Sequence, residues 1–376
     1  MCIRDRAFSL LNSHPQVQVR LFNPLSRESL KYWSYLVDFS RANRRMHNKS
    51  FTVDNAITVV GGRNIGEEYF ELDQDVAFDD FEVMAIGPVV SQVSAGFDQF
   101  WNSELSVPME AFKLSVESQD LDQWREFIQL EMDKQEQGPY GQAVNSPLLS
   151  ARRTGQLQPV PARTTLVTDT PDKLQHAVGD VAHATLALET GKRMQTAKRE
   201  VIIITPYFIP LDQGSQLIEQ ILAKGVRVVI ITNSLASTNH VPVYPAYTRY
   251  RKRLLQAGAE IYEIRPHANN GEDATSANPE MNTLHSKVTI FDRETLFVGS
   301  LNFDPRSLLI NSEMGLFIES DTAVAQLATT VEDNLPRSTY RVDLDEQGRL
   351  RWTYQLDDRQ RILTKSPQTS WWRRIS

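Results

Sequence analysis

A short sequence pattern that occurs twice constrains the fold of this chain more than any other feature. His47 and Lys49 form the first copy, and His285 and Lys287 form the second copy, far along the chain. In each copy a glycine and then an asparagine follow the histidine at the same offsets, as Gly61 and Asn64 in the first and as Gly299 and Asn302 in the second. Because the spacing is the same in both copies, we interpret them as an internal duplication. The duplication predicts two halves related by a pseudo-two-fold axis.

The region after residue 200 alternates β-branched runs with amphipathic segments. This alternation is typical of strand-helix-strand units in a parallel sheet. We predict strands at 201–205, 226–232, 259–264, 284–291, 295–298 and 314–318, and helices at 213–224 and 245–256. Around the first copy we predict matching strands at 17–22, 47–53, 56–60 and 81–87. The predicted fold class is therefore α/β, with two mixed sheets flanked by helices and a single active site between the halves.

The two halves divide the chain into four predicted regions. They are the first half, a helical and loop-rich connection, the second half and a tail, at residues 1–104, 105–165, 166–344 and 345–376. The stretch from position 201 to His285 contains a complete strand-helix-strand unit, whereas the stretch in front of His47 is much shorter. We therefore expect a strand-helix-strand unit to be missing in front of the first copy. Its absence would expose apolar side chains near 17–21 and 56–60.

Each motif places a histidine and a lysine two positions apart, so that on a strand both side chains share one face. A charged lysine has three donors and no lone pair, which suits it to an anion and not to a metal ion. Imidazole can be a nucleophile, a general acid or a general base near neutral pH. Two histidines on opposite sides of a phosphate predict phosphodiester transfer through a covalent phosphohistidine. We predict that His47, Lys49, His285 and Lys287 are catalytic, with no metal and no cofactor.

Each histidine also requires a carboxylate that orients its ring. Asp80 and Glu313 begin matching apolar strands, and the pseudo-two-fold symmetry predicts that each serves the histidine of the other half. Asn64 and Asn302 keep an equal offset from the two histidines, so we predict that they contact the phosphate. Arg45 lies in a run of arginines before the first motif. It is predicted either to bind a headgroup or to belong to a solvated charged surface.

Other polar residues are predicted to be structural. Asp54 and Asp292 lie at an odd offset from the histidine and lysine, beside predicted hairpin turns in which aspartate is favoured. The histidines at positions 14, 176, 183, 240 and 267 have no comparable sequence context. We therefore assign neither group to catalysis.

Composition narrows the possible classes of protein. The net charge of −7 and the pI of about 5.6 argue against a nucleic-acid partner, because such proteins usually carry a basic excess. No apolar run is long enough to span a bilayer, so no membrane-spanning helix is predicted. The single cysteine, Cys2, excludes an internal disulfide framework and fits a reducing compartment.

These residues resemble the phospholipase D superfamily. The motif His-x-Lys-x4-Asp occurs twice, followed by Gly-Gly-Arg-Asn-Ile-Gly in the first copy and by Gly-Ser-Leu-Asn-Phe-Asp-Pro-Arg-Ser in the second. Within the superfamily, the stretches from Asn43 to Asp54 and from Met84 to Val90 are similar to the bacterial cardiolipin synthases. The resemblance extends over nearly the whole chain after residue 7 and is weakest from about 105 to 165.

The resemblance implies a phosphatidyltransferase that makes cardiolipin from phosphatidylglycerol and phosphatidylethanolamine, with His47 as the nucleophile. It also implies a peripheral location on the cytoplasmic side of a bacterial membrane, and it specifies no protein partner. Hydrolysis by a phospholipase D, a superfamily nuclease and an inactive scaffold are the alternatives. For contact with the membrane, the candidates are the tail residues Trp371, Trp372, Arg373 and Arg374, or else Tyr32, Trp33, Tyr35 and the arginines before the first motif.

Overall fold

The chain folds into two compact units, which we describe separately. The computed structural model describes residues 3–24, 39–66, 69, 76–112, 118–136, 138, 141, 154, 159–238, 240, 243–266, 281–356 and 359–367. The first unit comprises residues 1–46, 95–159 and 170–175, and the second comprises residues 47–94, 160–169 and 176–376. The predicted boundaries between the halves stay a prediction. Residues 267–280 lie outside the described residues, as do all the candidate membrane-contact aromatic residues.

The first unit consists of helices and a short two-stranded ribbon. Its elements are α1 (Ile3–Asn12), β1 (Arg20–Phe22), α3 (Phe39–Ala42), β6 (Ser106–Pro108), α5 (Ser118–Glu136) and the 3-10 helices η2 (Met109–Phe112) and η3 (Pro171–Leu174). β1 pairs antiparallel with β6, so that Leu21 lies opposite Val107. The predicted strand 17–22 begins late because the N–H of Val19 donates to the side chain of Asn12 at 2.8 Å.

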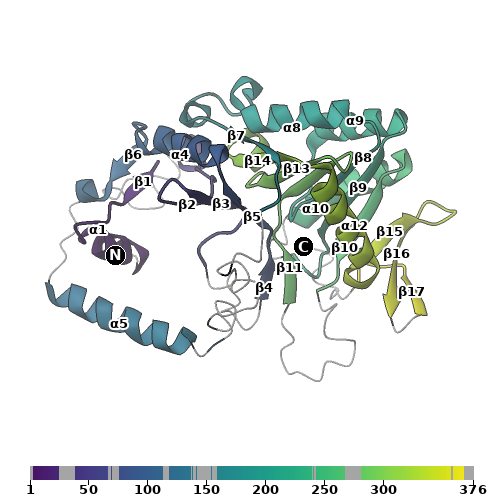
Figure 1. Ribbon diagram of the computed structural model, residues 1–376. Coiled ribbons are helices and arrows are strands. Elements are labelled where there is room, and N and C mark those ends of the chain that lie inside the picture. The colour runs from purple at the N-terminus through teal and green to yellow at the C-terminus, as the bar shows by residue number, and fades with distance from the viewer. Residues whose placement is uncertain are drawn as a thin grey trace. The chain divides into compact units, whose positions relative to one another are not determined.

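The second unit contains a ten-stranded mixed sheet, which runs through the right half of Figure 1. Its strand order is β17-β16-β15-β10-β9-β8-β12-β13-β14-β7. β8, β9 and β10 are parallel, and the other neighbours are antiparallel. The strands are β7 (Arg163–Thr168), β8 (Glu200–Ile204), β9 (Arg227–Asn233), β10 (Glu260–Ile264), β12 (Val288–Phe291), β13 (Thr295–Gly299), β14 (Met314–Glu319), β15 (Thr339–Leu344), β16 (Leu350–Leu356) and β17 (Arg359–Leu363). The predicted α/β class is confirmed.

Helices cover both faces of this sheet. α8 (Thr185–Thr196), α9 (Leu211–Ala223) and α10 (Val243–Ala257) lie on one face, and α12 (Asp321–Ser338) lies on the other (Figure 1). Along β8 the side chains alternate between the two cores: Ile203 packs with Leu186 of α8, and Ile202 packs with Val324 of α12. Because parallel strands are buried on both faces, β8 and β9 appear in the sequence as continuous apolar runs.

The first copy of the repeat forms a smaller, three-stranded sheet in the same unit. Its strands, in order, are β2 (Ser50–Val53), β3 (Ile57–Gly61) and β5 (Glu82–Ile86). Val60 on one face is buried against Val89 of α4 (Pro88–Trp101). On the other face Phe51 is 69% exposed and Ile86 is 48% exposed. In the predicted stretch 56–60, therefore, Val60 is buried, and the most exposed apolar side chains lie on the neighbouring strands.

Both motifs lie outside regular strands, which corrects the strands predicted at 47–53 and 284–291. β2 begins only at Ser50, and residues 285–287 separate β11 (Met281–Leu284) from β12. β11 instead pairs in parallel with β4 (Val76–Asp79). The backbone N–H groups of the motif histidines donate hydrogen bonds to the opposite copy, so these residues do not continue the regular β-ladder of their own strand. Strand alternation is therefore not the reason that each histidine and lysine act together.

One further difference concerns the edge of the large sheet. β7 begins at Arg163, inside the predicted connection, and pairs with β14. α11 (Pro305–Leu309) and the 3-10 helix η4 (Val181–His183) complete the second unit. Among the residues that the structure describes, no helix is both long enough and apolar enough to cross a bilayer.

Candidate active site

Carboxylates from opposite copies hold the two motif histidines. His47 Nδ1 lies 2.8 Å from Glu313 Oε2, and His285 Nδ1 lies 2.7 Å from Asp80 Oδ2. Both carboxylates are fully buried. A neutral imidazole that donates from Nδ1 keeps a free lone pair on Nε2. The crossed pairing therefore presents Nε2 of each ring for chemistry, and Asp80 and Glu313 lie where the symmetry argument expected them.

The backbone repeats the same crossed symmetry. The N–H of His47 donates to the carbonyl of Ser312 at 2.9 Å, and the N–H of His285 donates to the carbonyl of Asp79 at 2.8 Å. Ser312 and Asp79 each immediately precede the carboxylate that pairs with the histidine. Each histidine is thus fixed by its backbone and by its ring to the start of one strand in the other copy.

The two motif lysines lie beside the histidines, where Lys287 is buried and Lys49 is half-buried. Lys49 Nζ donates to the carbonyl of His47 at 2.9 Å, and Lys287 Nζ lies 2.9 Å from His285 Nδ1. Burial lowers the pKa of Lys49 to about 8 and the pKa of Lys287 to about 7, while the carboxylates of Asp80 and Glu313 oppose the shift. The negative charges of Asp80 and Glu313, one from each copy, both act on each lysine. The two motifs therefore lie at one site.

The two histidines differ in their surroundings. The side chain of His285 is 7% exposed, and that of His47 is 24% exposed. Burial lowers the pKa of His285 to about 4; the hydrogen bond to Asp80 opposes this shift, and the charge of Lys287 adds to it. His285 is therefore neutral in the resting enzyme at pH 7, and its Nε2 can accept a proton.

Tyr69 adds a contact to His285 that sequence reasoning missed. Its hydroxyl lies 3.3 Å from His285 Nε2, and the two rings meet edge to face with centroids 4.9 Å apart. The side-chain amide of Asn64 donates to the Tyr69 hydroxyl at 2.8 Å. Asn64 thus approaches His285 Nε2 through Tyr69, and its direct contact with a phosphate stays a prediction. The second copy offers no matching signal, because no tyrosine follows Asn302 at the same distance.

The residue after the first repeat glycine differs between the copies, and the difference has a structural reason. In the second copy the Ser300 hydroxyl donates to Glu313 Oε2 at 2.5 Å and accepts from the N–H of Met314 at 3.0 Å. In the first copy the matching residue is Gly62. A Cβ there would lie 2.8 Å from Asp80 Oδ1 and 2.9 Å from Lys287 Cδ, closer than such atoms approach in proteins. Position 62 therefore requires glycine, because the side chain of Lys287 passes directly beside it.

Asp169 is a second residue that sequence reasoning missed. It is fully buried at the end of β7. One carboxylate oxygen accepts from the N–H of Glu313 at 3.0 Å, and the other accepts from the N–H of Leu186 in α8 at 3.1 Å. Asp169 therefore ties the carboxylate partner of His47 to a helix terminus. Its sequence context, after a short β-branched run, gave no signal for this role.

Several buried oxygens near the motifs have no hydrogen-bond partner within the part of the chain that the structure describes. They are Asn48 Oδ1, Asn302 Oδ1, Ser312 Oγ and Glu313 Oε1. Buried polar atoms are nearly always paired, so unpaired ones in a group suggest space for a ligand or for water. The amide orientation of an asparagine is an assignment, and the opposite orientation of Asn302 would present an N–H donor to a phosphate.

Arg45 and the two turn aspartates make other contacts. Arg45 belongs to the first unit, where its guanidinium donates to the carbonyl of Asn23 at 3.0 Å. Its contact with a headgroup stays a prediction. Asp54 and Asp292 have φ values of 52° and 54°, as expected for turns. The Asp292 carboxylate accepts from three consecutive backbone N–H groups, those of residues 198–200, at 2.7 to 3.1 Å.

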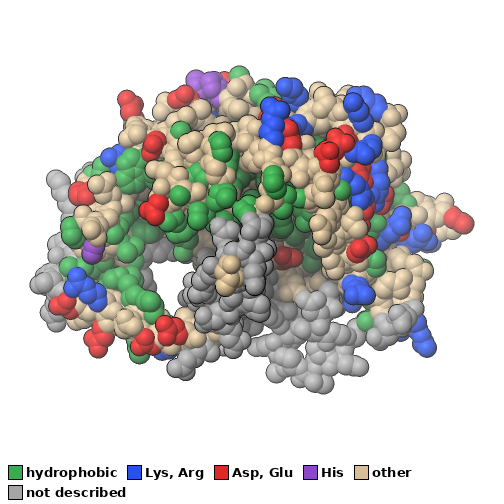
Figure 2. Space-filling view, in the orientation of Figure 1, with side chains coloured by type: hydrophobic (Ala, Val, Ile, Leu, Met, Phe, Trp, Pro, Cys, Tyr) green, Lys and Arg blue, Asp and Glu red, His purple; other side chains and the backbone are tan. Residues whose placement is uncertain are grey.

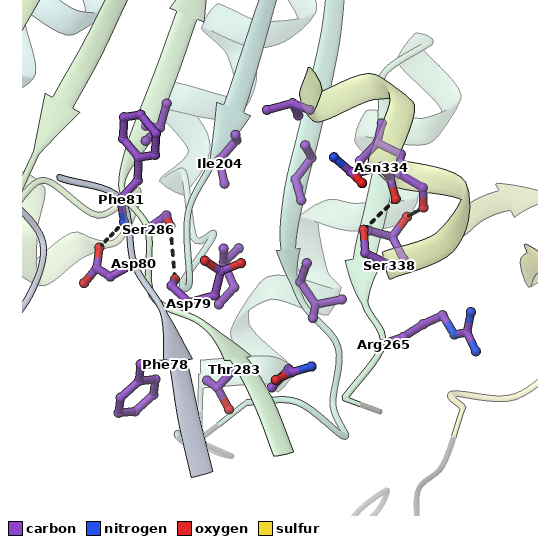
Figure 3. Close-up of a pocket in the computed structure, with 18 of the residues that line it drawn as sticks. Phe78, Asp79, Asp80, Phe81, Ile204, Arg265, Thr283, Ser286, Asn334 and Ser338 are labelled. Carbon is purple, nitrogen blue, oxygen red and sulfur yellow. Dashed lines mark hydrogen bonds between the residues drawn. The ribbon is translucent and has the colours of Figure 1, made fainter. Parts of the chain in front are cut away.

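A cavity of about 600 Å³ borders Asp80 (Figure 3). Asp79, Asp80 and Ser286 lie together at one side of the close-up, and Arg265 and Asn334 lie at the other. Its apolar wall includes Ile204, Ile231, Ile264, Leu327 and Val331. Burial and the adjacent Asp80 raise the pKa of Asp79. Apolar surface thus continues directly from Asp79 and Asp80.

Comparisons with known proteins agree with this fold. The crystal structure of phosphatidylserine synthase from Haemophilus influenzae covers 88% of this chain and 66% of its own, with a TM-score of 0.53 and 15% identity, and it shows the same fold. A family described as "Cardiolipin synthase, PLD-like domain" matches residues 191–334.

Cardiolipin synthase C of Escherichia coli is 37% identical over 99% of this chain and 79% of its own length. Cardiolipin synthase 1 of Staphylococcus aureus is 25% identical over 79% of this chain, which spans about half of that relative (48%). The chain belongs to the cardiolipin synthase family of phospholipase D-like enzymes.

Proposed function

We propose that this enzyme makes cardiolipin by transferring a phosphatidyl group from phosphatidylethanolamine to phosphatidylglycerol through a phosphohistidine. The observation that carries the proposal is the crossed pairing of two histidines with carboxylates from opposite copies, beside the two motif lysines. This arrangement offers two imidazole nitrogens and two cations to one phosphodiester. The printed names of the relatives from Escherichia coli and Staphylococcus aureus support cardiolipin as the product.

In the first step, His47 Nε2 attacks phosphorus in line with the leaving alcohol. The N–P bond forms, the bond from phosphorus to the ethanolamine oxygen breaks, and His285 donates a proton to that oxygen. Because His285 is neutral in the free enzyme, it requires the negative charge of the bound phosphodiester to raise its proton affinity. Lys49 and Lys287 stabilise the charge that develops on the non-bridging oxygens.

In the second step, a hydroxyl of phosphatidylglycerol attacks the phosphohistidine. His285 takes the proton of that hydroxyl, the new O–P bond forms, and His47 leaves. The products are cardiolipin and ethanolamine. The Tyr69 hydroxyl holds the hydrogen-bonding position on His285 Nε2 that the acceptor hydroxyl takes over. Asn302, buried with an unpaired Oδ1 among the described residues, is placed in this scheme against a phosphate oxygen.

The substrates place the enzyme at a membrane surface, and we propose a peripheral location on the cytoplasmic side of a bacterial membrane. The cavity beside Asp80 supports a lipid substrate, because its wall combines isoleucines with the charged residues of the site. Attack of water on the same phosphohistidine would give phosphatidic acid instead. A phospholipase D is therefore the alternative function of the same residues.

The test is to incubate the purified chain with vesicles that contain labelled phosphatidylglycerol, with and without phosphatidylethanolamine, and to separate the lipids. We expect labelled cardiolipin, together with released ethanolamine, in the mixture that contains phosphatidylethanolamine and not in the mixture without it, and we expect its formation to depend on His47. His47→Ala is the matched control. Phosphatidic acid as the main product would establish the hydrolase instead. No turnover of either lipid, by a chain shown to be folded, would overturn the proposal.

A further inference from the structure

Outside the active site, His176, Asp180 and His183 form a cluster on the second unit. One possible ligand atom from each residue lies within 4.8 Å of the other two. The two imidazole rings stack with centroids 3.6 Å apart and an interplanar angle of 9°. His183 Nε2 lies 3.8 Å from Asp180 Oδ2. Histidine side chains gather at the top of Figure 2, over the segment that leads into α8.

A tight turn brings the three residues together. Gly179 has a φ of +90°, a value that favours glycine, and the N–H of Asp180 donates to the carbonyl of Ala177 at 3.1 Å. Asp180 Oδ1 accepts from the N–H of Ala182 at 3.2 Å and so caps η4. The fold thus occupies Oδ1, and Oδ2 lies on the side of His183.

The composition of the cluster indicates which ion it suits. Two imidazole nitrogens and one carboxylate oxygen are ligands typical of zinc, whereas magnesium and calcium prefer oxygen alone. With bonds of about 2.0–2.1 Å, tetrahedral ligand atoms lie about 3.4 Å apart, so the cluster must contract by about 1 Å to bind. His176 and Asp180 are exposed and His183 is half-buried, which leaves the side chains free to make this adjustment.

We propose that His176, Asp180 and His183 bind one zinc-like divalent transition-metal ion, with water completing its coordination. The ion would fasten the turn at the start of α8. This site shares no residue with the phosphodiester site, and the proposal does not depend on the activity of the enzyme. It also assigns a role to two histidines that the sequence alone predicted to be structural.

The experiment titrates the tag-free protein with zinc chloride in a non-chelating buffer, against a colorimetric zinc indicator. We expect saturation at one zinc per chain, and affinity weaker by about tenfold or more in His176→Ala and His183→Ala. Asp180→Asn keeps an oxygen for the cap of η4 and removes the charge, so it should weaken zinc binding without loss of fold. His240→Ala, at an exposed histidine outside the cluster, is the matched control and should bind as the unchanged protein does.

Thermal unfolding gives the second measurement. Zinc should raise the melting temperature of the unchanged protein and of His240→Ala, and should leave that of His183→Ala in place. Magnesium should have no such effect. The proposal is overturned if zinc does not saturate the unchanged protein, or if all three cluster variants bind zinc as tightly as the control. Circular dichroism in metal-free buffer identifies any variant that fails to fold, and the remaining variants then decide.

Discussion

The two copies of the repeat present the same sheet face to different surroundings. Phe297 and Phe317 in the second copy are cross-strand neighbours, 1% and 0% exposed, and they belong to the core that contains residues of α8. Arg193 of α8 lies 4.3 Å over the Phe317 ring. The matching pair in the first copy is Val59 and Met84, also cross-strand neighbours, yet Met84 is 45% exposed. Equal strand pairing therefore does not determine burial, because the cover comes from other elements.

The motifs themselves show a related contrast. Both histidines have a carboxylate partner, but His285 is more deeply buried than His47, and burial lowers the pKa of His285 to about 4. Two chemically equal groups thus lie in different surroundings, which is how one site can use the same residue type for different roles. The duplication thus keeps equivalent residues at equivalent positions, while the two histidines differ in what surrounds them.

Removing either motif histidine should have the largest effect and should distinguish the copies. Replacing either one by alanine is expected to lower turnover by about 10⁴-fold. His47→Ala should form no covalent intermediate. His285→Ala should accumulate a phosphatidyl-enzyme when the donor has a good leaving group, since such a group needs little help from an acid. Mass spectrometry of acid-sensitive label on the protein measures this, and label on His285 in His47→Ala would reverse the two roles.

The covered and the exposed sheet faces should differ strongly in stability. Phe317→Ala is expected to lower the free energy of unfolding by about 3–5 kcal/mol, because it opens a cavity in a packed core. Met84→Ala, at the matching position, is expected to cost less than about 1 kcal/mol. Urea denaturation of both variants provides the comparison. Equal losses would show that another molecule covers the first face in solution.

Exchanging the residue that follows the repeat glycine tests the contrast inside the site. Gly62→Ser gives the first copy the residue of the second, and its Cβ would collide with Lys287 and Asp80. We expect kcat to fall by about 10²-fold, because the catalytic groups are displaced by about 1 Å. Ser300→Gly removes the bond to Glu313 without a collision and should cost less. Full activity in Gly62→Ser would mean that Lys287 need not occupy this position.

Replacing a motif lysine should have the smallest effect, which should appear in the pH dependence of the free energy of unfolding. The pKa of Lys287 falls from 10.5 to about 7 on folding, so between these values the unfolded chain binds more protons and stability rises with pH. Lys287→Met should therefore raise the free energy of unfolding by about 1 kcal/mol at pH 6, and the gain should fade near pH 10. Denaturation at both pH values measures it.

Lys49 provides the control for this prediction. Its pKa falls only to about 8, so Lys49→Met should gain less stability than Lys287→Met. Neither variant should keep full turnover, because each loses one cation from the phosphate site. A gain for Lys287→Met that is the same at pH 6 and pH 10 would contradict the assigned proton affinity.

The repeated spacing was enough to predict which histidines and carboxylates lie together. The symmetry argument placed Asp80 and Glu313 at the starts of matching strands, and in the structure each one contacts the histidine of the other copy. Continuous apolar runs predicted β8 and β9, because a strand that is buried on both faces consists almost entirely of apolar residues. The preference of aspartate for turns is also a local property, and it correctly predicted that Asp54 and Asp292 lie in turns.

The tertiary structure alone decided how the motifs are held. Backbone bonds to Ser312 and Asp79 interrupt the strands predicted through both motifs, and no local pattern records a partner that lies in the opposite copy of the repeat. Tyr69 and Asp169 likewise act through contacts with distant residues. The depth to which His285 is buried sets its proton affinity, and that depth depends on every element packed around it. A sequence records what each segment prefers by itself, whereas such contacts exist only after the segments have packed together.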